Sequence, residues 1–387
     1  MCGIAGILNY DRRKRAPPEI LEQMLESIFH RGPDENGSLL DRELAMGMRR
    51  LSIIDLVDGK QPMFDCSGRY GIVFNGEIYN YRELRKDLEN RGHKLSTHSD
   101  TEVIIHLFEE LGPECVHQLR GMFGFAIWDN RQRELFIVRD RLGIKPLYYT
   151  EASGCLVFAS EIKALLRHPE VGAQLDYHGL SRYLSLKYVP APGTMFANIR
   201  SLEPGHFLHA RNGQIETRRY WDISFKKNHP VKSDEEYSEE LLNLLRESVE
   251  LRLRSDVPFG AFLSGGLDSS VIVALMAEAM DEPVKTFSVG FSGAAGQDEL
   301  PYAQQIADRF GCDHHSFEIT ASDFLDYAET VLWHMDQPIS DHATVATFMV
   351  AKLARRHVKM VLTGEGGDEL FAGYARYQGE RFAPLGA

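Results

Sequence analysis

The sequence predicts an α+β domain followed by an α/β domain with a doubly wound parallel sheet. Up to about Tyr220, short apolar runs separated by Gly, Pro, Asn and Asp indicate strands, and helical periodicity between the runs indicates helices. Beyond residue 235, strands and helices alternate, as is typical of a doubly wound parallel sheet. With 387 residues, of which 43% are hydrophobic, the chain can form two domains with separate cores.

The elements of the first domain, residues 2–221, follow from these runs. Each strand is a short apolar run that ends at a turn-forming residue, and each helix has apolar residues three or four positions apart. Because helices occur between the strands, we expect helices to cover the sheets. Strands are expected at Tyr70–Phe74, Gly124–Trp128, Leu135–Val138 and Leu156–Ala159, and helices at Glu19–Phe29, Tyr81–Asn90 and Thr101–Leu111.

A polar stretch without periodicity, residues 222–235, is the predicted linker. Ser233 and Glu236 have the spacing of a capping box, which predicts that a helix begins there and that the second domain spans 236–387. Ligands of such a domain bind beyond the carboxyl ends of the strands. Strands are expected at Val257–Leu263, Val284–Phe291, His315–Ile319 and Val358–Leu362, and helices at Asp268–Met280, Leu300–Phe310, Phe324–Trp333 and Val345–Arg355.

The composition argues against several classes of protein. The net charge of −13 disfavours a generic binder of nucleic acid or anionic membranes, because phosphate-rich partners need a positive field. No apolar run approaches the length of a membrane helix, and the first residues lack the order of a signal peptide. The five cysteines are scattered and show no C-x-x-C spacing, which indicates reduced thiols in the cytoplasm and argues against a zinc site.

A glycine-rich turn follows the first strand of the second domain and opens a helix. Its sequence is Ser264-Gly265-Gly266-Leu267-Asp268-Ser269-Ser270. Such a turn presents backbone N–H groups and the positive end of the helix dipole to an anion. The sequence is neither a Walker A motif nor G-x-G-x-x-G. A tight turn without a ligand is the alternative, but hydroxyl groups and a carboxylate suit pyrophosphate and Mg²⁺.

A second unusual loop, residues 363–371, contains three carboxylates among glycines. By itself it could be a solvated turn. Because it follows another strand of the same predicted sheet, we expect Asp368 to share a metal with Asp268 while Glu365 faces the reacting centre. Together the two loops resemble the PP-loop ATP pyrophosphatase family, whose members activate a carboxylate or a similar oxygen as an adenylate and release pyrophosphate.

The chain begins with Met1-Cys2-Gly3-Ile4, so removal of Met1 would leave a thiol and a free α-amine on one residue. Near neutral pH the amine can act as a base for the thiol, because the reference pKa values are about 7.7 to 8.0 for the amine and about 8.5 for Cys. The alternative is a small buried residue at the start of a strand.

Further residues supply the groups that a glutamine pocket needs. Arg50 can clamp an α-carboxylate, and Asp100 can hold an α-ammonium group. The Asn75 side-chain amide and the Gly76 N–H can stabilise a tetrahedral oxyanion. Each has a structural alternative, namely a surface ion pair for Arg50, a hairpin turn for Asn75-Gly76 and a helix cap for Asp100.

In combination these segments resemble the N-terminal-nucleophile glutaminase domain of class II glutamine amidotransferases, an αββα sandwich. Residues 139–149 and 158–163 extend the likeness, and we expect them to form core strands and loops. This domain joined to a PP-loop domain is the arrangement of glutamine-hydrolysing asparagine synthetases.

The resemblance implies that Cys2 hydrolyses glutamine and that the ammonia passes through the interior to a second site. There ATP, with Mg²⁺, would adenylate the side-chain carboxylate of aspartate, and ammonia would displace AMP to give asparagine. Glutamine, aspartate and ATP are thus the implied ligands. The implied site residues are Cys2, Asn75, Gly76 and Glu365 for catalysis, Arg50, Ile54, Glu77 and Asp100 for glutamine, Leu263, Ser264, Gly265, Gly266, Asp268, Ser269, Ser270, Val289, Thr363 and Gly364 for the nucleotide, and Asp268 and Asp368 for the metal.

Family members continue well beyond the acidic loop, whereas this chain ends at Ala387, so we expect a second domain that is incomplete at its C-terminus. A glutaminase-only protein, an amidotransferase acting on another carboxylate and a non-catalytic regulatory relic are the alternatives. We expect no nucleic-acid or membrane partner. The oligomeric state stays open, with a homodimer as one possibility.

Overall fold

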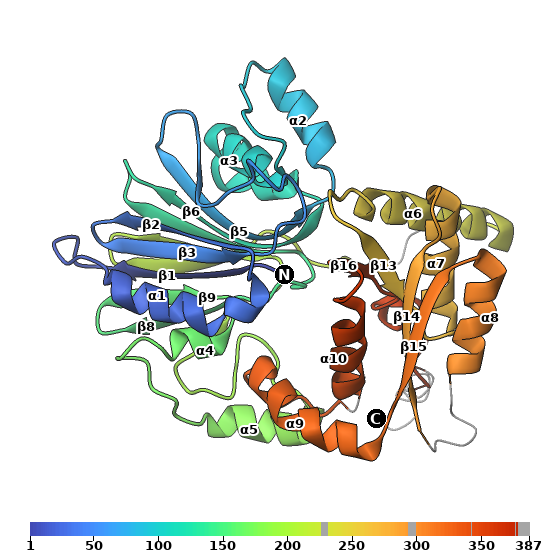
Figure 1. Cartoon of the computed structure of the whole chain (residues 1–387). Helices are drawn as coiled ribbons and strands as arrows, with labels where there is room; N and C mark the ends of the chain where they lie inside the picture. Colours follow the sequence, from blue (N-terminus) through green and yellow to red (C-terminus); the bar gives the residue numbers. More distant parts are fainter. Residues whose placement is uncertain (226–230, 293–298, 342, 376, 378–387) are drawn as a thin grey trace. The chain divides into compact units, whose positions relative to one another are not determined.

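The computed structural model describes residues 1–225, 231–292, 299–341, 343–375 and 377, and the chain folds into two units (Figure 1). Unit 1 comprises Met1–His229 and Leu332–Asp341, and unit 2 comprises Pro230–Val331 and His342–Ala387. The middle of the predicted linker, residues 226–230, lies outside the described residues. The domain bounds inferred from the sequence stay a prediction.

Among the described residues, unit 1 contains two six-stranded sheets in which neighbouring strands run antiparallel. In order across the first sheet, the strands are β10 (Arg200–Ser201), β8 (Tyr148–Ala152), β9 (Cys155–Ala159), β1 (Gly3–Asn9), β3 (Leu44–Arg50) and β2 (Glu35–Asp41). Across the second sheet they are β12 (Gln214–Arg219), β11 (His206–Arg211), β7 (Glu134–Arg139), β6 (Gly121–Asp129), β5 (Tyr70–Ile78) and β4 (Met63–Phe64).

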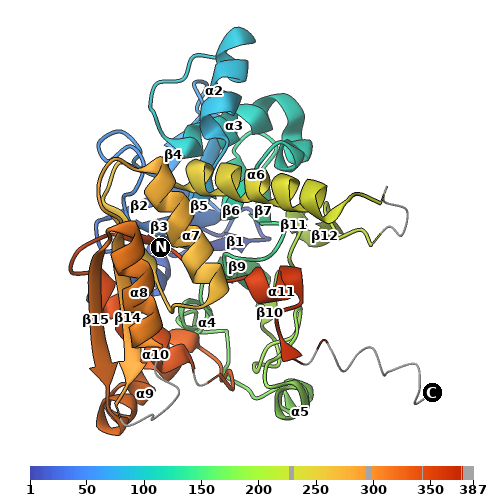
Figure 2. The same ribbon diagram turned by 90° about the vertical axis from the view of Figure 1, so that its right-hand side faces the viewer.

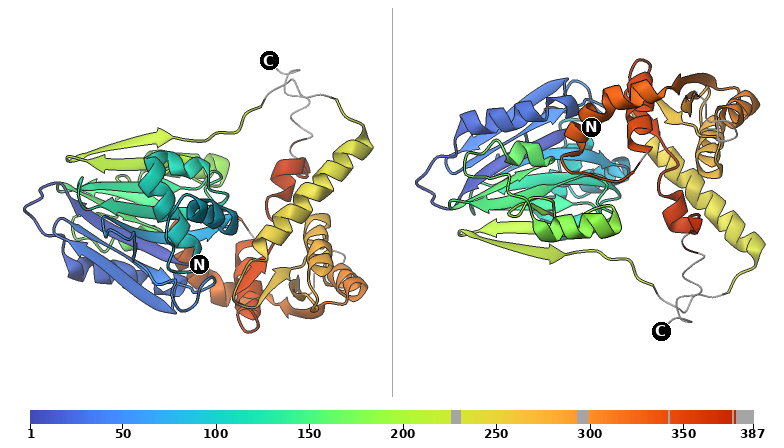
Figure 3. Two further views of the ribbon diagram at one scale, coloured as in Figure 1. Left: turned by 90° about the horizontal axis from the view of Figure 1, so that it is seen from above. Right: turned by 90° about the horizontal axis from the view of Figure 1, so that it is seen from below.

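Helices cover the outer face of each sheet of unit 1. Helices α1 (Pro18–Ser27) and α4 (Ile162–Leu165) pack on the first sheet, and α2 (Tyr81–Asn90) and α3 (Asp100–Leu111) lie on the other side, where α3 packs on the second sheet (Figure 1). The views from above and below show helices in front of the strands from both sides (Figure 3). Apolar side chains, among them Ile4, Met46 and Trp128, fill the space between the sheets. The predicted αββα sandwich is confirmed.

Unit 2 contains a parallel sheet with the strand order β15 (Asp313–Ile319), β14 (Lys285–Phe291), β13 (Phe259–Phe262) and β16 (Met360–Leu362) among the described residues. Ala261 belongs to the cluster under α7 (Leu267–Ala279) and α8 (Leu300–Phe310), whereas Phe287 packs against α10 (Ala343–Ala354). Helices therefore cover both faces of the sheet, and α7 and α8 lie side by side in Figure 2. The predicted doubly wound fold is confirmed.

The remaining elements include the start of unit 2. Helix α6 (Asp234–Arg252) begins with the predicted capping box, in which the Ser233 Oγ accepts the N–H of Glu236 at 3.2 Å and the Glu236 carboxylate accepts the N–H of Ser233 at 2.8 Å. The others are α5 (Tyr177–Leu186), α9 (Ala321–Met335), α11 (Gly367–Phe371) and the 3₁₀ turns Phe29–Arg31 and Gly112–His117. Among the described residues, no helix has the length and apolar character needed to cross a membrane.

Candidate active site

Cys2 lies directly before β1, next to the end of β3. Because β1 pairs antiparallel with β3, Gly3 is opposite Arg49, and the chain after β3 passes the Cys2 side chain. The backbone N–H of Leu51 donates to the Cys2 Sγ at 3.3 Å. Burial raises the pKa of the Cys2 thiol, although this N–H and nearby cationic groups oppose the increase. The thiol therefore needs a base before it can act as a nucleophile near neutral pH.

Lys145 lies beside the start of the chain. Its side chain is buried, and its Nζ is 2.9 Å from the Sδ of Met1. Burial lowers the pKa of Lys145 to about 8, so it is mostly charged near neutral pH, and its charge lowers the pKa of the Cys2 thiol. Burial likewise lowers the pKa of the Met1 α-ammonium group to about 5. This end of the sandwich thus favours a neutral amine, whereas burial opposes ionisation of the Cys2 thiol and the charge of Lys145 favours it.

Asn75 and Gly76 lie inside β5, so the hairpin-turn alternative is wrong. Asn75 is opposite Gly124 of β6, and a Cβ on Gly76 would clash with the carbonyl oxygen of Met122. The close approach of β6 therefore requires glycine at position 76. Local turn propensity is overridden here by pairing along the whole of a nine-residue strand.

The Asn75 amide is buried without a hydrogen-bond partner. The residue is 1% exposed, and neither its Nδ2 nor its Oδ1 has a partner among the residues that the structure describes. Side chains alternate between the faces of a strand, so Asn75 shares a face with Val73, which packs between the two sheets together with Cys2. An unpaired buried amide costs about 1 to 3 kcal/mol, so this one is suited to a ligand that binds on the Cys2 side.

The Arg50 guanidinium is buried, so the surface ion-pair alternative is wrong. Its Nη1 donates to Glu35 Oε2 at 2.7 Å, and its Nη2 donates to the carbonyl oxygens of Ile54 at 3.0 Å and Asp55 at 2.7 Å. Arg50 thereby holds the loop that also carries Leu51. The predicted residues Arg50 and Ile54 are thus joined in one structure beside Cys2.

Asp100 is the first residue of α3 and is buried. Burial raises its pKa to about 6, although hydrogen bonds from backbone N–H groups, one of them from Ile78 at 3.0 Å, oppose the increase. The capping position belongs to Ser99, whose Oγ accepts the N–H of Thr101 at 3.2 Å, so the helix-cap alternative for Asp100 is wrong. The charge of Arg50 opposes the increase in the pKa of Asp100, as it does for Cys2.

A chain of buried charges continues from Cys2 across unit 1. The Arg31 Nε donates to the carbonyl oxygen of Cys2 at 2.8 Å, and its Nη1 donates to Glu161 Oε1 at 2.8 Å. Glu161 also pairs with Lys163, whose Nζ is 2.8 Å from Asp336 Oδ1. Asp336 belongs to the segment 332–341, which comes from the second half of the sequence but folds with unit 1. The nucleophile's backbone is therefore held by a network that uses both halves of the chain.

Neither Arg31 nor a role of Lys145 in the site was predicted from the sequence. Arg31 lies in the run His30–Asp34, where charged residues surround a Gly-Pro pair between a helix and a strand, and this run is the signal that could have been noticed. Lys145 lies in the segment 139–149 that resembles the family. Glu77 was predicted, and it is buried in β5 with its charge acting on Lys145.

In unit 2 the glycine-rich turn connects β13 to α7. The φ of Gly265 is +78°, and a Cβ there would lie 2.6 Å from the N of Ala303, so both conformation and space favour glycine. The Ser264 and Ser269 Oγ atoms are 2.9 Å apart, and the N–H of Gly266 donates to the Ser264 Oγ at 3.2 Å. Within the described structure no side chain caps α7, so its first N–H groups are directed to the turn.

The acidic loop lies against this turn. A Cβ on Gly364 would be 2.7 Å from the N of Ser269 and 3.0 Å from the Cβ of Asp268, and one on Gly367 would clash with the Asp268 carboxylate. Asp368 follows in the first turn of α11. The two loops are therefore neighbours, whereas the roles of Asp268 and Asp368 as metal ligands stay a prediction.

The other predicted nucleotide residues lie at or beside the same sheet edge. Leu263 is buried, and its N–H donates to the carbonyl oxygen of Phe287 at 3.0 Å. Val289 is in the adjacent strand β14, and Ser270 Oγ donates to the carbonyl oxygen of Gly266 at 2.7 Å. Thr363 and Glu365 are exposed at the carboxyl end of β16.

Two family models match the chain. Residues 1–221 match a glutamine amidotransferase domain, and residues 240–385 match asparagine synthase. The first match ends close to β12, and the second begins within α6.

Curated relatives match most of this chain. Asparagine synthetase (glutamine-hydrolyzing) 1 of Bacillus subtilis is 40% identical over 98% of the chain and 60% of its own length. Amidase chyE of Penicillium rubens is 32% identical over 98% of the chain and 60% of its own length. The chain thus spans about three fifths of these two relatives.

A third relative is matched over more of its own length. Putative asparagine synthetase (glutamine-hydrolyzing) 2 of Methanocaldococcus jannaschii is 37% identical over 97% of the chain and 76% of its own length. With this match and the two family domains in this order, the chain belongs to the glutamine-hydrolysing asparagine synthetase family.

Proposed function

We propose that unit 1 hydrolyses glutamine to glutamate and ammonia, and that unit 2 uses ATP to adenylate the side-chain carboxylate of aspartate, from which ammonia displaces AMP. The observation that carries the proposal is the unpaired buried amide of Asn75 on the face of β5 directed to Cys2. An amide held ready without a partner is what an oxyanion hole requires.

The chemistry of unit 1 begins when Met1 has been removed. The free amine of Cys2 takes the thiol proton, and the thiolate attacks the side-chain carbonyl of glutamine. Asn75 and the Gly76 N–H stabilise the tetrahedral oxyanion. The protonated amine returns its proton to the leaving ammonia, and water then hydrolyses the glutamyl thioester at Cys2.

Charged groups around Cys2 would select the amino-acid end of glutamine. Asp100 holds the α-ammonium group, and Arg50 pairs with the α-carboxylate once it exchanges part of its contact with Glu35. Arg31 holds the backbone carbonyl of Cys2 and so fixes the orientation of the nucleophile. Each group acts on a different part of the substrate or of the nucleophile.

In unit 2 the backbone N–H groups at the start of α7 bind the phosphates of ATP. The backbone at Gly364 and Gly367 closely approaches Asp268, and Asp368 follows Gly367 directly in the sequence. Carboxylate oxygens suit Mg²⁺, so Asp268 and Asp368 would hold it. Mg²⁺ held there would neutralise negative charge on the phosphates. Glu365 is proposed to face the reacting carboxylate.

A paired product assay on the purified 387-residue chain tests the two halves separately. We expect glutamate from glutamine, and both AMP and asparagine from aspartate, ATP, Mg²⁺ and ammonia. Ammonia is added in the second reaction so that it does not depend on the first. Glutamate without AMP would show that unit 1 acts alone or that the acceptor is not aspartate, and no glutamate at all would contradict the proposal for Cys2.

A different carboxylate acceptor is a second candidate because one relative of similar coverage is named an amidase. Replacing aspartate with other carboxylates in the AMP-forming assay distinguishes the two. Release of AMP that depends on another carboxylate and not on aspartate would favour this candidate.

Glutamine affinity is expected to fall at acidic pH. Asp100 binds the α-ammonium group only as an anion, and burial raises its pKa to about 6, so its ionised fraction falls as the pH drops through this value. We expect glutamine to bind about tenfold more weakly at pH 5 than at pH 7. Calorimetry on a Cys2→Ala variant measures this affinity without turnover. In Asp100→Asn the affinity should be low and independent of pH, and a pH-independent affinity in the Cys2→Ala chain would contradict the role of Asp100.

A further inference from the structure

Two histidines and a glutamate converge at the outer helices of unit 1, and none of the three is among the proposed glutamine-site residues. His93 lies in the connection between α2 and α3, and His106 and Glu109 lie one turn apart on α3. The His93 Nδ1 and His106 Nδ1 are 3.2 Å apart, and the Glu109 Oε2 is 3.4 Å from His106 Nδ1 and 3.8 Å from His93 Nδ1. Three atoms that can ligate a metal thus form a small triangle.

The size of this triangle matches one face of a metal-ligand tetrahedron. Zinc binds histidine nitrogen at about 2.0 to 2.1 Å and carboxylate oxygen at about 2.0 to 2.2 Å, so ligand atoms around a tetrahedral ion are about 3.3 to 3.5 Å apart. Two of the three observed separations fall at or within about 0.1 Å of this range, and the third exceeds it by about 0.3 Å. An ion would therefore need only a small movement of the exposed Glu109 side chain.

A second carboxylate fixes the proton on His93. The His93 Nε2 lies 2.8 Å from Glu110 Oε1, and an ionised carboxylate only accepts hydrogen bonds, so Nε2 carries the proton. The Nδ1 of a neutral His93 then carries a lone pair that is directed to His106. Metal-ligating histidines characteristically donate their other ring N–H to a carboxylate in this way. Arg91 pairs with Glu110 and holds it in place.

Burial distinguishes this cluster from a chance group on the surface. The His106 side chain is 3% exposed and that of His93 is 16% exposed, whereas Glu109 is 41% exposed. Two imidazoles are thus fixed by packing, and the carboxylate side is open to solvent for entry of an ion and a water ligand. The alternative to a metal site is a hydrogen-bonded histidine pair, in which the two Nδ1 atoms and the Glu109 carboxylate share one proton.

We propose that His93 Nδ1, His106 Nδ1 and Glu109 bind a divalent transition-metal ion of the zinc class, with Glu110 orienting His93. Imidazole and carboxylate ligands suit Zn²⁺. The spacing of the cysteines argues only against a zinc site with cysteine ligands, and the ligands proposed here are histidine and glutamate. The ion joins the connection after α2 to the middle of α3, the helix that begins with Asp100, and so stabilises the helical layer over the second sheet.

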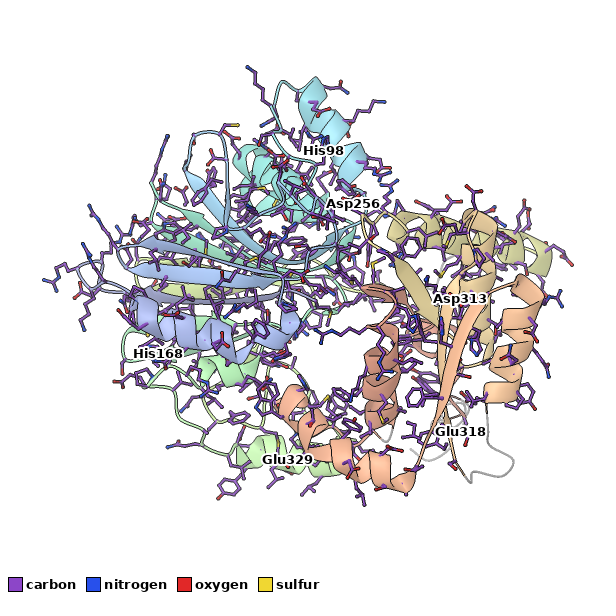
Figure 4. All side chains as sticks on the ribbon, viewed as in Figure 1. His98, His168, Asp256, Asp313, Glu318 and Glu329 are labelled. Carbon is purple, nitrogen blue, oxygen red and sulfur yellow. The ribbon has the colours of Figure 1, made fainter. Side chains whose placement is uncertain are left out.

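The experiment is a Zn²⁺ titration of the full chain against a chromophoric chelator, without ATP. We expect His93→Gln and Glu109→Gln to lose one bound Zn²⁺ per chain, and Glu110→Gln to weaken binding by about 10- to 100-fold. His98, labelled in Figure 4, is exposed on the same connection as His93. His98→Ala is therefore the matched control and should bind as the parent does.

Two outcomes would overturn the proposal. One is that both His93→Gln and Glu109→Gln bind the same number of Zn²⁺ ions with the same affinity as the parent. Because the Glu109 side chain is exposed, Glu109→Gln is expected to fold, so misfolding does not account for its result. The other comes from Co²⁺ as a probe, whose spectrum should show nitrogen and oxygen ligands. A thiolate-to-cobalt charge-transfer band would show a cysteine ligand instead. If replacing a cysteine removed this band and Glu109→Gln kept it, the ion would bind at another site.

Discussion

Replacing Cys2 with alanine is expected to lower glutamate release from glutamine by at least about 10³-fold, because the proposed glutamyl thioester forms on the Cys2 thiol. The AMP-forming reaction with added ammonia should keep its rate, since its residues lie in unit 2. Single-turnover glutamate formation and steady-state AMP formation, measured on the same preparation, give both values.

Cys66 offers a matched control for Cys2. It is an exposed thiol with its Sγ near the carbonyl oxygen of Lys94, so Cys66→Ala should release glutamate as the parent does. Substantial glutamate release by Cys2→Ala, above a tenth of the parent's rate, would mean that another group is the nucleophile.

Replacing Asn75 with leucine is expected to separate activity from stability. The turnover number for glutamine should fall by about 10² to 10³, as on removal of one oxyanion donor. The free energy of unfolding should stay level or rise, because an apolar group of similar shape removes an amide that has no partner in the described structure. Most substitutions of buried residues instead lower the free energy of unfolding. Glutamate assays and urea unfolding measure the two quantities.

Gln61 provides the contrast for Asn75. Its Oε1 accepts the N–H of Phe74 in β5 at 2.7 Å, and its Nε2 donates to the Thr101 Oγ1 at 3.1 Å. Gln61→Ala should therefore lower the free energy of unfolding by about 1 to 3 kcal/mol. If Asn75→Leu lost as much stability as Gln61→Ala, Asn75 would be a structural residue rather than an oxyanion donor.

Local sequence patterns predicted the elements because each is encoded over a short span. The capping box at Ser233 and the glycine-rich turn after β13 lie where the sequence indicates, since cap and turn chemistry involves neighbouring residues. The periodicities of strands and helices likewise predicted both fold classes, and the two-domain order is confirmed by the family matches.

What the sequence did not predict depends on residues far apart. The tendency of Asn75-Gly76 to form a turn is overridden by β6, and the buried position of Arg50 depends on Glu35 of the neighbouring strand. Arg31 and Lys145 act on the first two residues of the chain, from positions that only the folded sheets bring close. No local periodicity encodes such contacts, so sequence patterns could suggest the types of residue but not their partners.

The segment 332–341 limits how this protein can be divided. Asp336 accepts the N–H of Ile162 at 2.6 Å and pairs with the buried Lys163, so a cut at the linker would separate unit 1 from part of its own interior. A buried charge left without its partner is costly, about 3 to 5 kcal/mol. An exchange of the second half by recombination therefore has to bring an equivalent aspartate with it, which ties the inheritance of the two halves together.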